Sequence, residues 1–448
     1  MRVDVLETSE LGDRSYVVSD GTCALVIDPQ RDLDRVEKLV ADLGVPLAMV
    51  LETHIHNDYV TGGHALARRS GATYVVAGRD EVGFERCAAH DGDDLTVGSM
   101  NVHVLETPGH TDTHLSYVVT DHSGDPPAVF TGGSLLYGSV GRTDLLGEDR
   151  TDDLTRKQWR SARRLAEVLP DEAPVFPTHG FGSFCSTGTS TGDTSSTIGA
   201  EKQHNDALTE DDEQAFVDRL VAGLTGYPAY YVHMAPLNAQ GPDVPDLSPV
   251  PGMDPAELTA RIRTGEWVVD LRDRAAYAEH HLAGTVSIML GDQFSTYLGW
   301  VIPWGAPITL IGETAQQVAE AQRQLVRIGV EHLAGAATGE LSSLAPDQPV
   351  RSYQRVTFRE VAAADAPVVL DVRRADEVAK SSIRGAVHIP LDRLADRLHE
   401  VPHGKVWVHC GSGFRASIAA SILDRAGHEV VHIDDAYDNA QAAGLTVE

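Results

Sequence analysis

The sequence has few cysteines: Cys23, Cys87, Cys185 and Cys410 are the four in 448 residues. No two of them form a CxxC pair, which excludes a disulfide-rich scaffold and a zinc ribbon. No apolar run approaches the roughly 18–20 residues of a membrane span. The start, MRVDVLETSELGDRSYVV, is acidic where a signal peptide is basic and then apolar. We therefore expect a cytoplasmic protein without a membrane partner.

Basic residues are also scarce, with 36 Lys and Arg against 66 Asp and Glu and a formal net charge of −30. Because an acidic surface repels a polyanion and no basic cluster interrupts it, nucleic acid is excluded as a partner. Apolar residues make up 42% of the chain, which is enough for packed cores. The length predicts two to four domains.

The pattern along the chain predicts three domains. Residues 1–240 contain short apolar strands bounded by turns, and a Gly-, Ser- and Thr-rich segment at 182–199 predicts a mobile loop. Five prolines between Pro242 and Pro255 mark 241–253 as a linker. The remainder is an internal repeat, in which VVDLRDRAAYAEHHLAGTVSI aligns with VLDVRRADEVAKSSIRGAVHI. Strand–helix alternation predicts two small parallel α/β domains, at 254–347 and 352–448.

A cluster of histidines follows the predicted strands of the first domain. His54, His56 and Asp58 alternate after the strand MVLETH, so they lie on one side of an extended chain. His110 and His179 follow two later strands. Imidazole and carboxylate groups are ligands for zinc or iron. These five residues are the candidate metal ligands.

The motif Thr53–Tyr59 resembles the THxHxDH signature of the metallo-β-lactamase superfamily, which implies an αββα sandwich over residues 1–240. GRTDL (141–145) and SSTIGAEKQHN resemble the branch of persulfide dioxygenases fused to rhodaneses. That resemblance implies one divalent metal, Fe(II) in preference to Zn(II), held by two His and one Asp. His54 and His110 match the two histidines.

Two positions depart from the pattern of that branch. Gly133 stands where the family has its aspartate, and Tyr59 stands where the motif has its last histidine. Asp112 or Asp144 is a possible replacement for the missing carboxylate. Arg142 resembles the family's substrate-binding arginine, whose planar guanidinium suits a carboxylate; the alternative is a surface pair with Asp144.

The strand KVWVHC ends at Cys410, and a Gly-rich turn follows it before a helix. Backbone N–H groups and the helix N-terminus favour a thiolate at Cys410, and Arg415 would neutralise an anion held there. The loop itself consists of Gly411, Ser412, Gly413 and Phe414. It resembles the six-residue active-site loop of a rhodanese, which makes Cys410 the sulfur carrier and gives both C-terminal domains a three-layer α/β rhodanese fold. Asp371 and Glu377 also match.

The first repeat has Glu313-Thr314-Ala315 at the equivalent loop, with neither Cys nor Arg. We interpret it as a structural spacer or docking domain. Cys185 is either a sulfur relay near the metal or an incidental loop cysteine.

Together these features predict an enzyme of sulfur metabolism. A small thiol persulfide would be oxidised to sulfite at the metal, and Cys410 would exchange sulfur with sulfite or another acceptor. A metal-dependent thioester hydrolase of the hydroxyacylglutathione hydrolase type is one alternative. A sulfurtransferase with a binding-only N-terminal domain is the other. The thiol carrier and the oligomeric state stay open, a homo-oligomer included.

Overall fold

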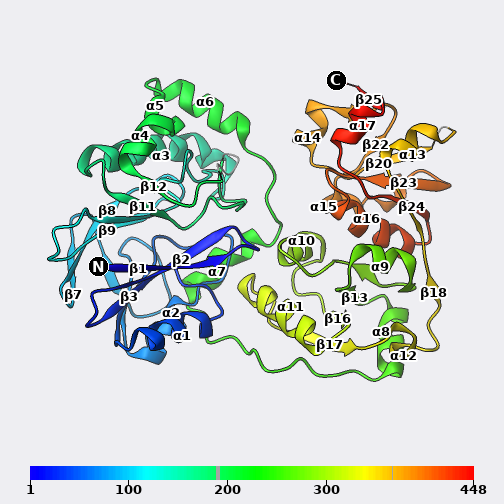
Figure 1. Cartoon of the computed structure of the whole chain (residues 1–448), viewed down its shortest axis with the longest axis horizontal. Helices are drawn as coiled ribbons and strands as arrows, with labels where there is room; N and C mark the ends of the chain where they lie inside the picture. Colours follow the sequence, from blue (N-terminus) through cyan, green and yellow to red (C-terminus); the bar gives the residue numbers. More distant parts are fainter. Residues whose placement is uncertain (188–191, 366, 448) are drawn as a thin grey trace. The chain divides into compact units, whose positions relative to one another are not determined.

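A computed structural model describes residues 1–187, 192–365 and 367–447. The chain divides into two compact units, one of Met1–Asp246 with Val326–Gly329 and one of Leu247–Leu325 with Val330–Glu448. The break after Asp246 falls inside the predicted linker at 241–253. Both units mix helices and strands (Figure 1). Within the described ranges, no helix has the length and apolar character needed to cross a bilayer.

The first unit contains two six-stranded sheets. One has the order β1 (Arg2–Thr8), β2 (Asp13–Ser19), β3 (Ala24–Ile27), β4 (Leu47–Leu51), β5 (Thr73–Ala77), β6 (Cys87–Ala89). The other has the order β12 (Ser196–Thr197), β11 (Pro174–Pro177), β10 (Ala128–Gly132), β9 (Leu115–Thr120), β8 (Met100–Glu106), β7 (Asp94–Val97). The helices are α1 (Asp34–Leu43), α2 (Gly63–Ser70), α3 (Glu148–Val168), α4 (Ile198–His204), α5 (Asp206–Thr209), α6 (Glu213–Gly223) and α7 (Tyr231–Gln240).

Alternation along the strands builds four layers. In β2, Val18 belongs to the core between the two sheets, whereas its neighbour Val17 packs with α1 and α2 on the outer side. In β10, Phe130 faces the inter-sheet core and Val129 packs with α3 and α6. Helices therefore cover the outer face of each sheet, and the predicted αββα sandwich is confirmed.

The second unit contains two parallel sheets. One has the order β15 (Val286–Ser287), β13 (Trp267–Asp270), β16 (Ile308–Gly312), β17 (Leu333–Thr338). The other has the order β19 (Gln354–Val356), β24 (Glu429–Ile433), β23 (Lys405–His409), β20 (Val368–Asp371), β22 (Val387–His388). Two-stranded pairs are formed by β14 (His281–Leu282) with β18 (Val350–Arg351) and by β21 (Ser382–Ile383) with β25 (Thr446–Val447).

Helices alternate with these strands, as expected of parallel α/β structure. The first half has α8 (Pro255–Thr264), α9 (Arg274–Glu279), α10 (Phe294–Val301), α11 (Ala315–Arg327) and α12 (Leu341–Leu344). The second half has α13 (Phe358–Ala363), α14 (Ala375–Lys380), α15 (Leu391–Leu394), η1 (Leu398–Glu400), α16 (Phe414–Arg425) and α17 (Asp438–Ala442).

The internal repeat extends to one ion pair. At the end of β13, Arg272 binds both carboxylate oxygens of Asp270 and the carbonyl of His280. At the end of β20, Arg373 binds Asp371 and the carbonyl of Ser381 in the same way. An arginine fork thus closes the strand–helix turn in both halves.

The Gly-, Ser- and Thr-rich segment at 182–199 is not wholly a loop. Residues 188–191 of this predicted mobile loop lie outside the described residues. Ser196–Thr197 form β12, which pairs with β11. The helix α4 begins at Ile198, because the Thr197 hydroxyl accepts a hydrogen bond from Ala200 N at 3.2 Å and caps it. The composition of the segment does not by itself predict this helix cap.

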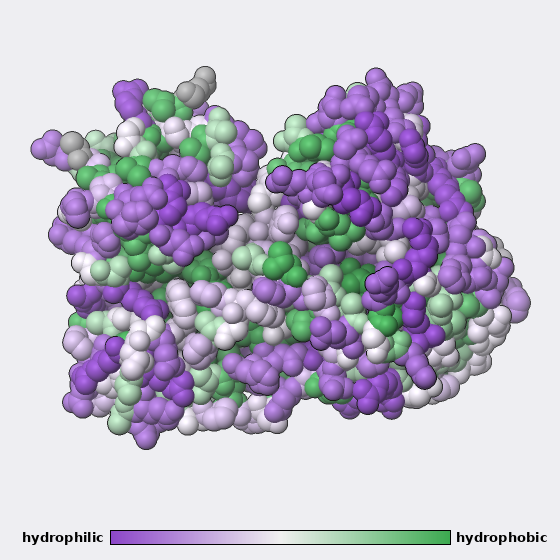
Figure 2. Space-filling model, turned by 180° about the vertical axis from the view of Figure 1, so that it is seen from behind, coloured by the Kyte–Doolittle hydropathy of each residue, from purple (hydrophilic) through white to green (hydrophobic). Residues whose placement is uncertain are grey.

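Hydrophilic residues cover most of the face shown in Figure 2, in keeping with the excess of acidic side chains. Apolar residues gather in the cores instead.

Replacement of Phe130 by alanine tests the inter-sheet core. Its ring is fully buried and lies 5.2 Å from that of Tyr16 and 5.1 Å from that of Phe176, centroid to centroid. Phe130→Ala should lower the free energy of unfolding of this unit by about 3–5 kcal/mol in a urea titration, because it removes apolar contacts and leaves a cavity. Val168→Ala, at a position 54% exposed, is the control and should change it by less than about 0.5 kcal/mol. Equal effects of the two changes would contradict the assigned core.

Candidate functional site

Three buried histidines converge at the ends of strands in the first unit. His54 follows β4, His110 follows β8 and His179 follows β11. One ring nitrogen of each lies within 4.8 Å of the others, and the Nε2 atoms of His54 and His179 are 3.3 Å apart. This is the geometry of ligands around a common point.

A second layer of hydrogen bonds fixes the orientation of each ring. The Nδ1 atoms of His54, His110 and His179 lie 2.9 Å from Thr53 Oγ1, 2.7 Å from the Arg142 carbonyl oxygen and 2.9 Å from Asp13 Oδ1. The Thr53 hydroxyl already donates to Asp28, so it accepts from His54. Each Nδ1–H therefore donates a hydrogen bond to a group outside the cluster, and each Nε2 faces the shared point, as in histidines that bind metals.

Unpartnered polar atoms support a metal at this point. Among the described residues, His110 Nε2, His56 Nδ1 and Asp58 Oδ1 are buried without a hydrogen-bond partner. Burial lowers the pKa of His110 to about 3 and that of His54 well below its usual value, so both imidazoles stay neutral and keep a lone pair. Neutral imidazole with carboxylate is a donor set that fits a divalent metal ion.

His179 has the opposite electrostatic environment. Burial disfavours its charge, but the carboxylates of Asp58 and Asp13 outweigh burial and raise its pKa well above the usual value. Without a metal, its Nε2 proton points at His54. A bound cation would replace that proton, since a ligating imidazole must be deprotonated.

His56 and Asp58 share this centre from the other side. Together with His179 they form a second group of buried ligand atoms within 4.8 Å of one another. His56 Nε2 lies 3.3 Å from Asp28, 3.2 Å from Glu52 and 2.9 Å from the Tyr59 hydroxyl. Burial lowers the pKa of His56, but Asp28 and Glu52 raise it to about 9 overall. Tyr59 thus serves as a hydrogen-bond partner of His56.

The missing aspartate leaves no vacant space. A Cβ atom added to Gly133 would lie 2.4 Å from His110 Cδ2, so position 133 faces the centre but has no room for a side chain. Gly133 N donates to His114 Nε2 at 3.0 Å. Neither proposed replacement carboxylate lies here: Asp112 pairs with Arg150 and Lys157, and Asp144 pairs with Arg142. His179 occupies the third position around the point that His54 and His110 share.

Arg142 differs from its predicted role in substrate binding. Its guanidinium donates to both Asp144 oxygens at 2.7 Å and to the carbonyl oxygens of Phe184 and Thr225. It is buried and lies over the Tyr227 ring. Because its donors are used within the protein, Arg142 acts here by placing its own carbonyl against His110.

Sequence reasoning missed Asp28, which joins the histidine loops. Its carboxylate accepts hydrogen bonds from Thr53 N and Oγ1, both at 2.7 Å, and from the Thr178 hydroxyl. Its backbone has φ +50°, the one positive value at a non-glycine among the described residues. An Asp-Pro step directly after a strand was the available signal, because aspartate tolerates this conformation.

In the second unit, Cys410 lies directly after β23 and is buried. Gly413 N donates to its Sγ at 3.2 Å, as the predicted loop requires. Gly413 has φ +88°, and a Cβ there would lie 2.1 Å from Asp434 Oδ1. His432 fixes the Gly413 carbonyl oxygen at 2.9 Å. Glycine is therefore needed at this turn.

Arg415 lies against the loop through a carboxylate fork. Its Nη1 and Nη2 donate to Glu377 at 2.5 and 2.7 Å, and its Nη2 is 3.1 Å from a Cβ added to Gly411. Asp371 lies near His409 Nε2, at 3.4 Å. The sequence predicted that Arg415 neutralises an anion bound in the loop. In the structure Glu377 neutralises the Arg415 charge.

Cys185 lies in the first unit, with its Sγ 4.0 Å from the Tyr231 hydroxyl. Burial, followed by the negative charges of Asp58 and Asp13, raises its pKa well above the usual value. The neutral thiol is favoured, which disfavours a sulfur relay through Cys185.

Comparison with known proteins gives two family matches. Residues 11–179 match the metallo-beta-lactamase superfamily, and residues 357–443 match the rhodanese-like domain. A solved structure titled as a metallo-beta-lactamase from Staphylococcus aureus subsp. aureus COL is 28% identical, with a TM-score of 0.68. The alignment covers 76% of this chain and 99% of that one.

Two curated relatives each match about two fifths of the chain. A hydroxyacylglutathione hydrolase-like protein of Homo sapiens is 32% identical over 181 residues, which is 40% of this chain and 59% of that protein. The mitochondrial persulfide dioxygenase ETHE1 of Homo sapiens is 28% identical over 200 residues, 44% of this chain and 70% of that protein. The chain thus spans about three fifths of the length of the hydrolase-like relative.

The αββα sandwich, the histidines at its strand ends and the cysteine loop agree with these matches. Residues 11–179 belong to the metallo-beta-lactamase superfamily, and residues 357–443 form a rhodanese-like domain.

Proposed function

We propose that the chain oxidises a low-molecular-weight persulfide to sulfite in its first unit and transfers sulfane sulfur through Cys410 in its second. The observation that carries the first part is the convergence of the Nε2 atoms of His54, His110 and His179, with no side chain at Gly133. Three neutral donors on one side would hold one divalent metal and leave positions for small ligands. We propose Fe(II) in preference to Zn(II) because the reaction reduces O₂ and Zn²⁺ has no redox chemistry.

The net reaction at this centre balances without another reductant. A persulfide RSSH with O₂ and water gives RSH, sulfite and two protons, so the sulfane sulfur loses four electrons and O₂ gains them. A ferrous ion bound there would bring O₂ and the persulfide sulfur together. The protein orients the three imidazoles through Thr53, the Arg142 carbonyl and Asp13.

The second part rests on the Cys410 loop. The Sγ atom receives the Gly413 N–H, and α16 begins at the next residue, so a negative sulfur would be stabilised by the loop backbone. Sulfite released in the first unit is an acceptor for sulfur carried on Cys410. Two sites in one chain raise the effective concentration of this shared product.

The second candidate is metal-dependent hydrolysis of a thioester. The 32% identity to a hydroxyacylglutathione hydrolase-like protein favours it. A two-metal hydrolase needs a carboxylate at position 133 and a ligand at Tyr59, and neither is available here. We therefore rank hydrolysis below oxidation.

Oxygen consumption separates these reactions. With glutathione persulfide as the probe, the iron-loaded protein should consume one O₂ per sulfite formed, measured with an oxygen electrode and by sulfite analysis. Cleavage of S-lactoylglutathione without oxygen uptake would support the hydrolase. Thiosulfate-dependent transfer alone would support a sulfurtransferase with a binding-only first unit.

Metal content tests the ligand set independently of activity. His110→Ala and His179→Ala should each lower metal per chain at least tenfold in elemental analysis, because each removes an inward-facing Nε2. His103→Ala is the matched control, since His103 is a half-buried histidine of β8 that pairs with Asp94 away from this centre. Full metal content in His179→Ala would contradict the assigned centre.

Replacement of Cys410 tests sulfur transfer. Cys410→Ser should reduce thiosulfate:cyanide sulfur transfer by at least about 10³-fold, since the nucleophile is lost, while metal content stays unchanged. Cys87→Ser, a change at a half-buried thiol of β6, should leave transfer within twofold. Transfer retained in Cys410→Ser would overturn the role of Cys410.

A further inference from the structure

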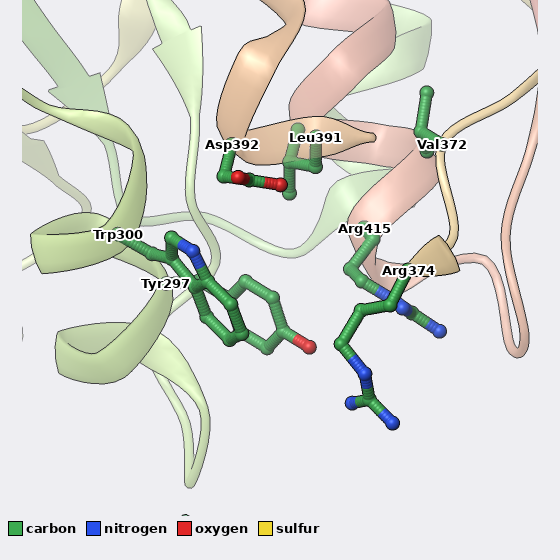
Figure 3. A pocket seen from close by; sticks show the side chains of 7 residues that line it. All are labelled: Tyr297, Trp300, Val372, Arg374, Leu391, Asp392 and Arg415. Atoms are coloured by element: carbon green, nitrogen blue, oxygen red, sulfur yellow. The ribbon is translucent and has the colours of Figure 1, made fainter. Parts of the chain in front are cut away.

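A pocket of about 250 Å³ lies against the cysteine loop of the second unit. It is lined by Tyr297, Trp300, Val372, Arg374, Leu391, Asp392 and Arg415. Figure 3 shows the Tyr297 and Trp300 rings on one side and the Arg374 and Arg415 side chains on the other, with the Asp392 carboxylate pointing in. Of these side chains, the sequence assigned Arg415 to an anion at the cysteine loop and gave the others no role.

The aromatic side of the pocket comes from the half that lacks a cysteine. Tyr297 and Trp300 lie on α10, in the repeat predicted at 254–347 as a spacer or docking domain. Their ring centroids are 5.7 Å apart and the rings are stacked. Tyr297 also meets Phe414 of the cysteine loop edge to face at 5.4 Å. The cysteine-less repeat therefore forms part of the surface beside Cys410.

Hydrogen bonds and ion pairs join the two halves of the second unit. Arg274 binds Asp434 at 2.9 Å, and Ser287 N donates to the Ser421 hydroxyl at 2.9 Å. His281 Nε2 lies 3.2 Å from Asp424. All these residues belong to the same compact unit. The half that carries α10 is therefore bonded to the half that carries Cys410.

The pocket offers two cations, one anion and two π faces. Asp376 holds Arg374 through Nε and Nη2, which leaves Nη1 without a hydrogen-bond partner among the described residues. Glu377 holds Arg415 at the loop. The Asp392 carboxylate and the aromatic rings suit an ammonium group, whereas Arg374 suits a carboxylate. Inorganic thiosulfate needs only the cations.

We propose that the two repeats together form a binding site for a small persulfide that carries both an ammonium and a carboxylate group. Asp392 and Arg374 line the same pocket, so one small ligand can meet an anion and a cation there. The ammonium group lies between Asp392 and the Trp300 ring, the carboxylate binds Arg374, and the sulfane sulfur reaches the loop beside Arg415. This proposal rests on sulfur transfer by Cys410.

The transfer step balances with the persulfide as the one co-reactant. The Cys410 thiolate attacks the outer sulfur of RS–SH, so a new S–S bond forms at Sγ and the RS–S bond breaks. The RS⁻ group leaves with the electron pair, and Cys410 becomes Cys–S–SH. The sulfur on Cys410 is then passed to an acceptor.

Three sulfur donors test the proposal with the full-length protein. They are L-cysteine persulfide, 3-mercaptopropionate persulfide, which lacks the ammonium group, and thiosulfate. Thiocyanate formation with cyanide measures kcat/KM, and the rate of Cys410→Ser is subtracted as background. The wild type should prefer the cysteine persulfide over its ammonium-free analogue by about tenfold.

The variants assign this preference to side chains. Trp300→Ala should lower kcat/KM for cysteine persulfide about tenfold and leave thiosulfate within twofold. Asp392→Asn should abolish the preference over 3-mercaptopropionate persulfide. Trp304→Ala is the matched control, because Trp304 lies four residues on and does not line the pocket. Thermal unfolding of each variant verifies that it folds.

The outcomes separate this proposal from sulfur transfer itself. If Trp300→Ala lowered kcat/KM equally for all three donors, Trp300 would have a structural role and the proposal would be overturned. A wild type without preference would also overturn it. Absence of transfer from every donor to cyanide in the wild type would instead refute the role of Cys410.

Discussion

The first unit depends on one buried carboxylate. Asp28 lies after β3 and accepts hydrogen bonds from Thr53 and Thr178, the residues that directly precede His54 and His179. It also lies 3.3 Å from His56 Nε2. One side chain thereby sets the relative positions of histidines that follow β4 and β11, strands that belong to different sheets. The convergence of the imidazoles follows from this link between the two sheets.

Asp28 keeps its negative charge in the buried site because neighbouring groups donate hydrogen bonds to its carboxylate. Burial alone would raise the pKa of Asp28, but His56 and the two threonine hydroxyls outweigh burial and lower it. A charged Asp28 accepts a hydrogen bond from the Thr53 hydroxyl, so the Thr53 oxygen is left to accept a hydrogen bond from His54 Nδ1. The tautomer of His54, and hence the direction of its lone pair, is therefore decided by the charge on Asp28.

The second unit uses carboxylates for a different purpose. Asp371 and Asp270 hold arginine forks that close equivalent turns in the two repeats, and Glu377 holds Arg415 against the cysteine loop. The first repeat has no Cys at its loop but has the same framework. Its α10 could then present Tyr297 and Trp300 beside Cys410, so a half without chemistry of its own contributes to the neighbouring site.

The sequence by itself determined the repeat, the candidate histidines and the Cys410 loop, because each depends on spacing within one strand, turn or helix start. The αββα class followed from the resemblance to the metallo-β-lactamase superfamily. The sequence also identified Gly133 and Tyr59 as departures from the family pattern. Only the tertiary structure decided that His179 lies beside His54 and His110 and that the Arg142 guanidinium pairs with Asp144. It also showed that hydrogen bonds to Asp28 position the loops of the histidine centre. It likewise brought Trp300 beside Arg415. Sheet order and packing set such contacts between distant segments, and local patterns carry no record of them.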